Sequence, residues 1–216
     1  MNAAANCAPA PGRRARRKAE LRQRLLAAAL DLFARRGFFP TTVEQITEAA
    51  DVAKGTFFNY FPSKEHVLAG FGDMQLARIE AARAEARAGR RPAREILHRL
   101  VHALAENPGR SQALVRSLLV ANLSSEAVRK LLRRKLLYGR RRLAEIIAYG
   151  QRRGEITRRR KPIELARFLQ QLMFGTFLLW AAFPPSRLAD WIEPTFELYW
   201  SGVSAQSRSL GTRLNS

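Results

Sequence analysis

Residues 24–68 contain the pattern that most restricts how this chain folds: four short helical segments joined by turns of only a few residues. In the first segment, apolar residues recur at intervals of three and four, which places them on one face of a helix. Gly37 is expected to end that helix, because glycine adopts a positive φ without a Cβ clash. Phe38 is expected to fold back onto Phe33. The spacing predicts a compact helix-turn-helix unit.

The second segment is expected to start near Thr41, because Thr41 and Glu44 have the spacing of a capping box. After a tight turn comes a third, very short helix, in which Phe57 and Phe61 lie four residues apart and point inward together. The other side chains of residues 54–60 are small, polar, basic or aromatic and remain on the outer side. A short helix with such an outer face fits the major groove of DNA.

The stretch resembles the DNA-binding domain of the TetR (tetracycline-repressor) family over about residues 20–70. The residues that carry the resemblance are Leu32, Phe33, Gly37, Phe38, Thr41, Thr42, Val43, Ile46 and the run KGTFFNYFPSKE from Lys54 to Glu65. The resemblance implies an all-α homodimer that regulates transcription, usually as a repressor that a small molecule releases from DNA. It implies that the DNA-binding residues are Thr42, Lys54, Gly55, Thr56, Phe58, Asn59, Tyr60 and Lys64, with Thr42 and Lys64 on phosphates.

Two residues depart from the family pattern. Ala53 stands where the family commonly has a serine that caps the recognition helix, and the absence of that cap costs about 1 kcal/mol. Phe58 stands where a tyrosine is frequent; phenylalanine contacts a thymine methyl group but cannot donate to phosphate. A dimer would place two recognition helices on a palindromic operator in double-stranded DNA. A purely structural helical corner is the alternative, but its outer face would need none of these basic and polar groups.

After residue 71 the sequence keeps helical periodicity, and prolines, glycines and serines divide it into helices expected at 92–106, 110–121, 125–153, 163–183 and 187–203. The expected fold class is all-α: an N-terminal three-helix helix-turn-helix domain plus a C-terminal helical bundle for ligand binding and dimerisation. The expected organisation is a disordered basic arm over 1–19, the DNA-binding domain over 20–70, the effector-binding and dimerisation domain over 71–204, and a flexible tail over 205–216.

The second half of the helix expected at 163–183 is apolar on nearly all sides. Its uninterrupted apolar part, 172–183, is too short to span a bilayer, so we expect no membrane association. A helix with apolar residues on two faces packs against its own core and against a partner subunit. The residues expected at a dimer interface are Phe168, Leu172, Leu179, Trp191, Phe196 and Tyr199.

The formal net charge of +20 favours a polyanionic partner. Most of the excess lies after residue 70, outside the helix-turn-helix stretch. Two explanations stay open: a genome of high GC content that favours arginine codons, or an anionic effector such as an acyl-CoA, because arginine binds phosphate and carboxylate groups well. The one cysteine, Cys7, excludes a disulfide within the chain, and no secretory signal is visible, so we expect a cytoplasmic protein.

No enzymatic motif stands out, and we expect neither an enzyme nor a cofactor nor a bound metal. The alternative is a metal-dependent helical-bundle enzyme that uses Glu95, His98 and His102, which recur at i, i+3 and i+7 on one helix face. Otherwise these histidines are expected to hydrogen-bond within the bundle or to line an effector cavity. The expected ligand-binding residues are His98, His102, Asn122, Tyr138, Gln171, Phe174 and Phe177.

Overall fold

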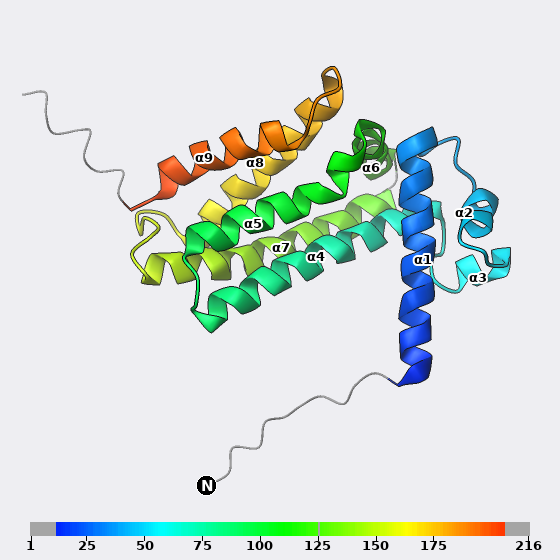
Figure 1. Ribbon diagram of the computed structural model, residues 1–216, viewed down its shortest axis with the longest axis horizontal. Coiled ribbons are helices and arrows are strands. Elements are labelled where there is room, and N and C mark those ends of the chain that lie inside the picture. The colour runs from blue at the N-terminus through cyan, green and yellow to red at the C-terminus, as the bar shows by residue number, and fades with distance from the viewer. Residues whose placement is uncertain (1–11, 125, 206–216) are drawn as a thin grey trace, which may run out of the picture.

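The computed structural model describes residues 12–124 and 126–205 (Figure 1). The helices in chain order are α1 (Arg13–Arg36), α2 (Val43–Ala49), α3 (Lys54–Phe58), α4 (Lys64–Ala88), α5 (Ala93–Glu106), the short 3₁₀ helix η1 (Pro108–Arg110), α6 (Gln112–Ser124), α7 (Glu126–Arg152), α8 (Pro162–Ala182) and α9 (Ala189–Val203). Apart from one isolated bridge between Ile156 and Ser204, the described residues form no β-structure. The predicted all-α fold is confirmed.

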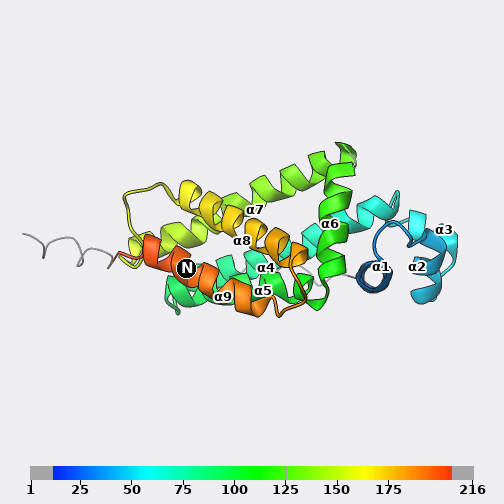
Figure 2. The same cartoon turned by 90° about the horizontal axis from the view of Figure 1, so that it is seen from above.

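The helices form two regions that α4 connects. The helices α1, α2 and α3 gather at one end of the molecule, and α4 to α9 extend away from them as an elongated bundle (Figures 1 and 2). Within the bundle, α4 packs against α5 and α7, and α8 packs against α6, α7 and α9. The expected domain boundary at residue 70 therefore falls inside α4, which belongs to both regions.

The first turns of α1 differ from the sequence-based expectation. The sequence predicts that residues 13–19 belong to a disordered arm, but α1 is helical from Arg13 onward. The segment consists only of arginine, alanine and lysine, which have high helix propensity, and the helix continues from it to the buried positions Leu25 and Leu26. The rest of the expected arm, 1–11, and nearly all of the expected tail, 206–216, lie outside the described residues.

The beginning of α2 is a second correction. The N-cap is Thr42, whose side chain accepts a hydrogen bond from the backbone N–H of Gln45, while the Gln45 side chain accepts one from Thr42 N–H. The predicted box of Thr41 and Glu44 is thus wrong by one residue. Thr41 is instead fully buried and donates its hydroxyl to the carbonyl of Gly37, so it ties the turn to the end of α1.

Each region has its own hydrophobic core. The smaller one combines residues of α1 to α4, including Phe33, Ile46 and Phe57, with Leu114 from α6. Because α6 contributes to this core and Ser111 donates to the carbonyl of Ala34 at 3.0 Å, the two regions are joined by packing as well as by α4. The larger core lies among the helices α4 to α9.

The larger core also corrects two residues of the expected dimer interface. Phe196 and Tyr199 are buried within the single chain, at 0% and 5% exposed, so neither side chain is available to a partner subunit. They lie on the face of α9 that packs onto the bundle. Among the described helices, none combines the length and apolarity that a bilayer crossing requires.

Candidate DNA-binding surface and ligand cavity

The third helix, α3, presents the two faces that its sequence predicts. Phe57 and Phe61 are buried at 0% and 2% exposed, and their ring centroids lie 5.6 Å apart. Phe58 is 49% exposed, and Lys54, Gly55 and Asn59 are exposed beside it. As expected for Ala53, no side chain caps the start of α3. The turn before it needs a positive φ at Asp51, 51°.

The exposed end of the motif carries a cation and an anion in contact. Lys54 at the start of α3 forms an ion pair with Glu44 of α2. The hydrogen bond from Lys54 lowers the pKa of Glu44 to about 2, so this carboxylate is charged at any physiological pH. A phosphate group that approached Lys54 would have to compete with Glu44. The pair therefore links α2 and α3 when DNA is absent.

Lys64 has a different environment from the one that its sequence position predicts. Its Nζ donates to the carbonyls of Phe38, Phe39 and Thr41 at 2.9, 3.2 and 2.8 Å. It also lies 4.5 Å from the centre of the Phe38 ring, and burial lowers its pKa. All three ammonium donors have protein acceptors. We conclude that Lys64 fixes the α1–α2 corner to the start of α4. A phosphate at its predicted position would have to compete with these three carbonyls.

The first turns of α1 lie beside the recognition element. A shallow hollow is lined by Tyr60 and by Arg14, Ala15, Arg17, Lys18 and Leu21. Three cations of α1 thus stand next to a residue that the family resemblance places on DNA. The basic run 13–18 is visible in the sequence. Its side chains lie beside Tyr60 only because the run is helical.

Removing these cations should weaken DNA binding, because fewer phosphates would be neutralised. In a variant with Arg14→Ala, Arg17→Ala and Lys18→Ala, the plot of log K against log salt should become shallower by about 0.9 for each phosphate that the variant no longer neutralises. The matched control replaces Arg158, Arg159 and Arg160, which lie at the far end of the bundle, in the loop between α7 and α8 (Figure 1). Equal slopes for both variants would show that only net charge matters.

The bundle encloses a cavity of about 190 Å³ among α4, α5, α6, α7 and α8. Its wall is almost entirely apolar. Polar or charged side chains reach it at four positions, Gln75, Lys135, Arg140 and Gln170. Gln75 donates to the carbonyl of Leu104 at 2.8 Å, and among the described residues its buried Oε1 has no hydrogen-bond partner. Arg140 donates to Gln170 at 2.9 Å.

Two of the predicted ligand-binding residues, Phe174 and Phe177, line this cavity. Tyr138 is 41% exposed and donates to Glu80, and Gln171 is exposed, so neither lies in the cavity wall. The side chain of Asn122 lies outside the described part of the chain. The cavity residues that the sequence analysis missed, notably Gln75 and Lys135, come from α4 and α7, and their helical periodicity alone could not distinguish core from cavity.

His98 and His102 also lie away from the cavity, between α5 and α9. Both donate toward Glu193 of α9 rather than Glu95, which pairs with Arg91. Hydrogen bonds from His102 and His98 lower the pKa of Glu193. The predicted trio of Glu95, His98 and His102 is therefore wrong in its carboxylate, because Glu95 points to another partner.

Comparisons with known proteins agree with this geometry. Residues 25–71 match the family model described as bacterial regulatory proteins, tetR family. The chain is 34% identical over 111 residues to the transcriptional repressor KstR of Rhodococcus jostii, and 49% identical over 57 residues to the transcriptional regulator TcmR of Streptomyces glaucescens. These matches cover 50% and 26% of this chain, but only 52% of KstR and 25% of TcmR, so they span about half or less of each relative.

A solved structure extends the similarity over most of the fold. The crystal structure of Thermus thermophilus FadR, a TetR family transcriptional repressor in complex with lauroyl-CoA, is 34% identical in sequence and has a TM-score of 0.61. The comparison covers 84% of this chain and 94% of that one. The resemblance first carried by residues 20–70 thus continues through the helical bundle, and the chain belongs to the TetR family of bacterial regulatory proteins.

Proposed function

We propose that this chain is a transcriptional regulator, acting as a repressor, that binds a palindromic operator as a homodimer and that an effector with an apolar tail and an anionic head group releases it. The observation that carries the proposal is α4, which extends from the helix-turn-helix region into the wall of the cavity. A helix of 25 residues is about 37 Å long. One rigid element therefore connects the proposed DNA-binding surface to the proposed effector site. On this proposal the chain is not an enzyme.

The DNA-binding part of the proposal rests on the outer face of α3 and its neighbours. The proposed contacts are Thr42, Lys54, Gly55, Thr56, Phe58, Asn59 and Tyr60, with the cations of the first turns of α1 added and Lys64 removed. Such side chains suit the edges of bases and the phosphates that flank them.

The dimer part rests on an apolar stripe that a single chain leaves exposed. Phe168, Leu172 and Leu179 on α8 are 40%, 39% and 51% exposed, and Leu198 on α9 is 72% exposed. Large apolar side chains that share one face of neighbouring helices are typical of a subunit interface. Trp191 is half-buried and donates to Ser186, so it belongs at most to the edge of this face.

We expect charge on this stripe to separate the subunits. Leu172→Glu combined with Leu179→Glu should raise the dimer dissociation constant by about 100-fold or more, because each carboxylate would lie at the interface. Sedimentation velocity measures the change. Leu137→Glu on α7, where the native residue is 42% exposed, is the control. A double variant that remains dimeric at micromolar concentration would place the interface elsewhere.

The effector part rests on the composition of the cavity. Apolar side chains suit an alkyl chain, and Lys135 and Arg140 supply positive charge for a phosphate or carboxylate. The FadR structure named above holds lauroyl-CoA, a ligand of this class. The volume of about 190 Å³ is smaller than the roughly 300–1,000 Å³ of typical ligand pockets. A long-chain ligand would therefore require the helices to move apart.

A chain of ion pairs offers a route from the cavity to the DNA-binding region. Lys135 of α7 pairs with Asp73 of α4, and Asp73 accepts from Arg22 of α1 at 2.9 Å. An anionic head group beside Lys135 would compete with Asp73. A ligand shifts an equilibrium between two states only by the difference in its affinity for them. The state with the helices moved apart, which binds the ligand more tightly, must therefore be a dimer whose recognition helices no longer match the operator.

Replacing Lys135 tests this route. Lys135→Met keeps the apolar stem and removes the charge, so operator affinity without ligand should stay within about fivefold. The lauroyl-CoA concentration that releases half of the DNA should rise by about tenfold or more, since the ligand would have one charged hydrogen bond fewer. Fluorescence anisotropy of a labelled operator measures both. Lys130→Met, in the same helix but 76% exposed and paired with Glu126, should respond like the unaltered protein.

The proposed function as a whole is tested by selecting genomic DNA fragments with the purified chain at a stated salt concentration, because phosphate contacts make affinity salt-dependent. Enrichment of a palindromic sequence, released by lauroyl-CoA, is the expected result. Retention of all fragments with equal salt sensitivity would contradict it, because the net charge alone would then account for binding. Enrichment without release by an acyl-CoA would leave the DNA-binding part and overturn the effector class.

A further inference from the structure

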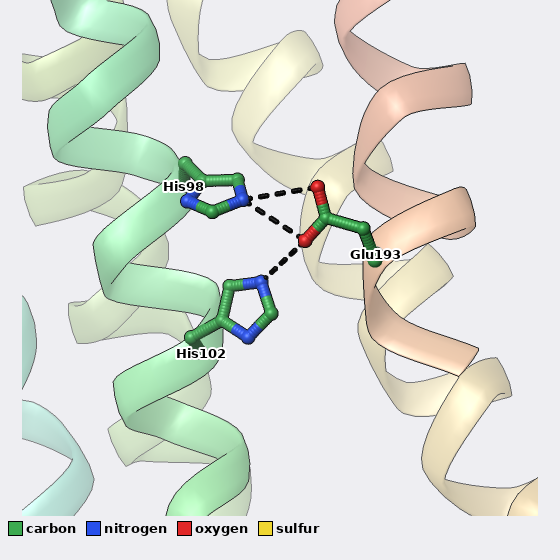
Figure 3. Close-up of side chains that lie close together, drawn as sticks. All are labelled: His98, His102 and Glu193. Atoms are coloured by element: carbon green, nitrogen blue, oxygen red, sulfur yellow. Dashed lines mark hydrogen bonds and ion pairs between the residues drawn. The ribbon is translucent and has the colours of Figure 1, made fainter. Parts of the chain in front are cut away.

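Three side chains outside the cavity and outside the DNA-binding surface converge between α5 and α9 (Figure 3). The Nε2 atoms of His98 and His102 lie 2.9 and 2.8 Å from the same carboxylate oxygen of Glu193, Oε2. His98 Nε2 also lies 3.1 Å from the second oxygen, Oε1. One ligand atom from each residue can be chosen so that all three lie within 4.8 Å of one another.

The chemistry of this group is that of a metal site. Two imidazole nitrogens and one carboxylate form a donor set that binds Zn²⁺ and related divalent ions. The histidines are four positions apart in the sequence, so they project from the same side of α5 one turn apart, as paired histidine ligands do in helical metal sites. The carboxylate comes from a different helix, 95 residues away in sequence from His98.

The two separations between an imidazole nitrogen and the carboxylate oxygen also suit an ion. Ligands at about 2.0–2.1 Å from a tetrahedral Zn²⁺ lie roughly 3.3 Å from one another. The observed 2.8 and 2.9 Å would need to lengthen by only a few tenths of an ångström. His98 packs edge-on against Phe196, with ring centroids 5.1 Å apart, and this contact holds its imidazole toward α9.

We propose that His98, His102 and Glu193 form a binding site for a divalent transition metal ion, with Zn²⁺ as the reference ion, that fastens α9 to α5. The three side chains are 34%, 34% and 47% exposed, so an ion reaches them without opening the bundle. Three protein ligands leave at least one coordination position for water. The site is therefore exchangeable, and its effect is on the stability of the α5–α9 contact.

The neighbouring carboxylates do not compete for this role. Glu95 pairs with Arg91, and Glu197 of α9 pairs with Arg94. Both carboxylates lie on α5 or α9, the helices that carry the proposed ligands, and each already has an arginine as its counter-charge. Glu193, in contrast, has two imidazoles as partners, which can release it to a metal ion and bind the same ion themselves.

Titration of the full chain, first dialysed against a chelator, tests the site. Calorimetry with Zn²⁺ should give one ion per chain, and Co²⁺ should give the visible absorption of a nitrogen- and oxygen-ligated ion. At about 100 times the dissociation constant, Zn²⁺ should raise the melting temperature by about 5–10 °C. An unaltered chain that binds neither ion would overturn the proposal.

Variants identify the ligands. His98→Gln, His102→Gln and Glu193→Gln should each weaken Zn²⁺ binding by about 100-fold or more. Replacing a residue that only hydrogen-bonds to a metal ligand already lowers metal affinity by about 10–100-fold. Glu95→Gln, on the same helix, and His66→Gln, which removes a histidine outside the site, should bind as the unaltered chain does. Circular dichroism of each metal-free variant checks folding. If Glu95→Gln abolishes binding, or if the folded His98→Gln and Glu193→Gln variants both retain it, the assignment is wrong.

Discussion

The Phe57→Ala variant is expected to lose about 3–5 kcal/mol of the free energy of unfolding, which is the usual cost of removing a buried aromatic side chain. Phe57 is 0% exposed and its ring contacts both Phe58 and Phe61, at centroid distances of 5.4 and 5.6 Å. The core of α1 to α4 would lose its central ring, so operator binding should disappear together with stability. Urea denaturation and operator binding, measured on one preparation, give both quantities.

The adjacent residue is a matched control. Phe58 is 49% exposed, so Phe58→Ala should change the free energy of unfolding by no more than about 0.5 kcal/mol. On the proposed function, this variant should nevertheless weaken operator binding, because the ring is available to a base. Equal stability losses for the two variants would contradict the inward and outward faces described for α3. A Phe58→Ala variant with unchanged operator affinity would remove that residue from the proposed DNA-binding set.

The second large effect is expected at Lys64. Lys64→Met removes the ammonium group that holds three backbone carbonyls, of Phe38, Phe39 and Thr41. The expected loss is about 1.5–3 kcal/mol of the free energy of unfolding, the range for hydrogen bonds that involve a charged group. Because these three hydrogen bonds join the α1–α2 corner to α4, operator affinity should fall as well. Thermal unfolding should show that the variant is less stable, which is the expected cause of the weaker binding.

The salt dependence of DNA binding separates this structural role from a phosphate contact. If Lys64 bound a phosphate, Lys64→Met would lower the slope of log K against log salt by about 0.9 per subunit. With all three donors occupied inside the protein, we expect the slope to remain. Lys54→Met is the comparison, since Lys54 is exposed and forms its ion pair with Glu44 at the protein surface. It should keep the stability and lower the slope. A lower slope for Lys64→Met together with a loss of stability for Lys54→Met would instead make Lys64 the phosphate contact and Lys54 the structural residue.

Much of the architecture is local information, and the sequence predicts it well. The expected helices 92–106 and 125–153 differ from α5 and α7 by one residue at most at either end, because their limits are set by nearby prolines, glycines and serines. The edge contact of Phe33 and Phe38, with ring centroids 5.2 Å apart, and the inward pair Phe57 and Phe61 follow from spacings of at most five residues. Periodicity suffices for contacts between residues so close along the chain.

The errors arose where a choice depended on distant elements. Helical periodicity places apolar residues on α9 but does not decide which face meets the bundle. The sequence therefore predicts Phe196 and Tyr199 at a subunit interface, whereas both are buried within the chain. The same limit affected the predicted ligand residues. Tyr138 and Gln171 lie on helices whose inner faces line the cavity, but on the sides turned away from it.

Residue types at short, fixed spacings were enough to define the helical segments, the helix-turn-helix and the family. The packed structure was needed to show that Lys64 closes the α1–α2 corner, that Lys135 and Arg22 share Asp73, and that Glu193 rather than Glu95 faces the two histidines. These partners are 23 to 95 residues apart. Each meets the other only after helices have packed, and the packing is set by the sum of many buried contacts and not by any local pattern.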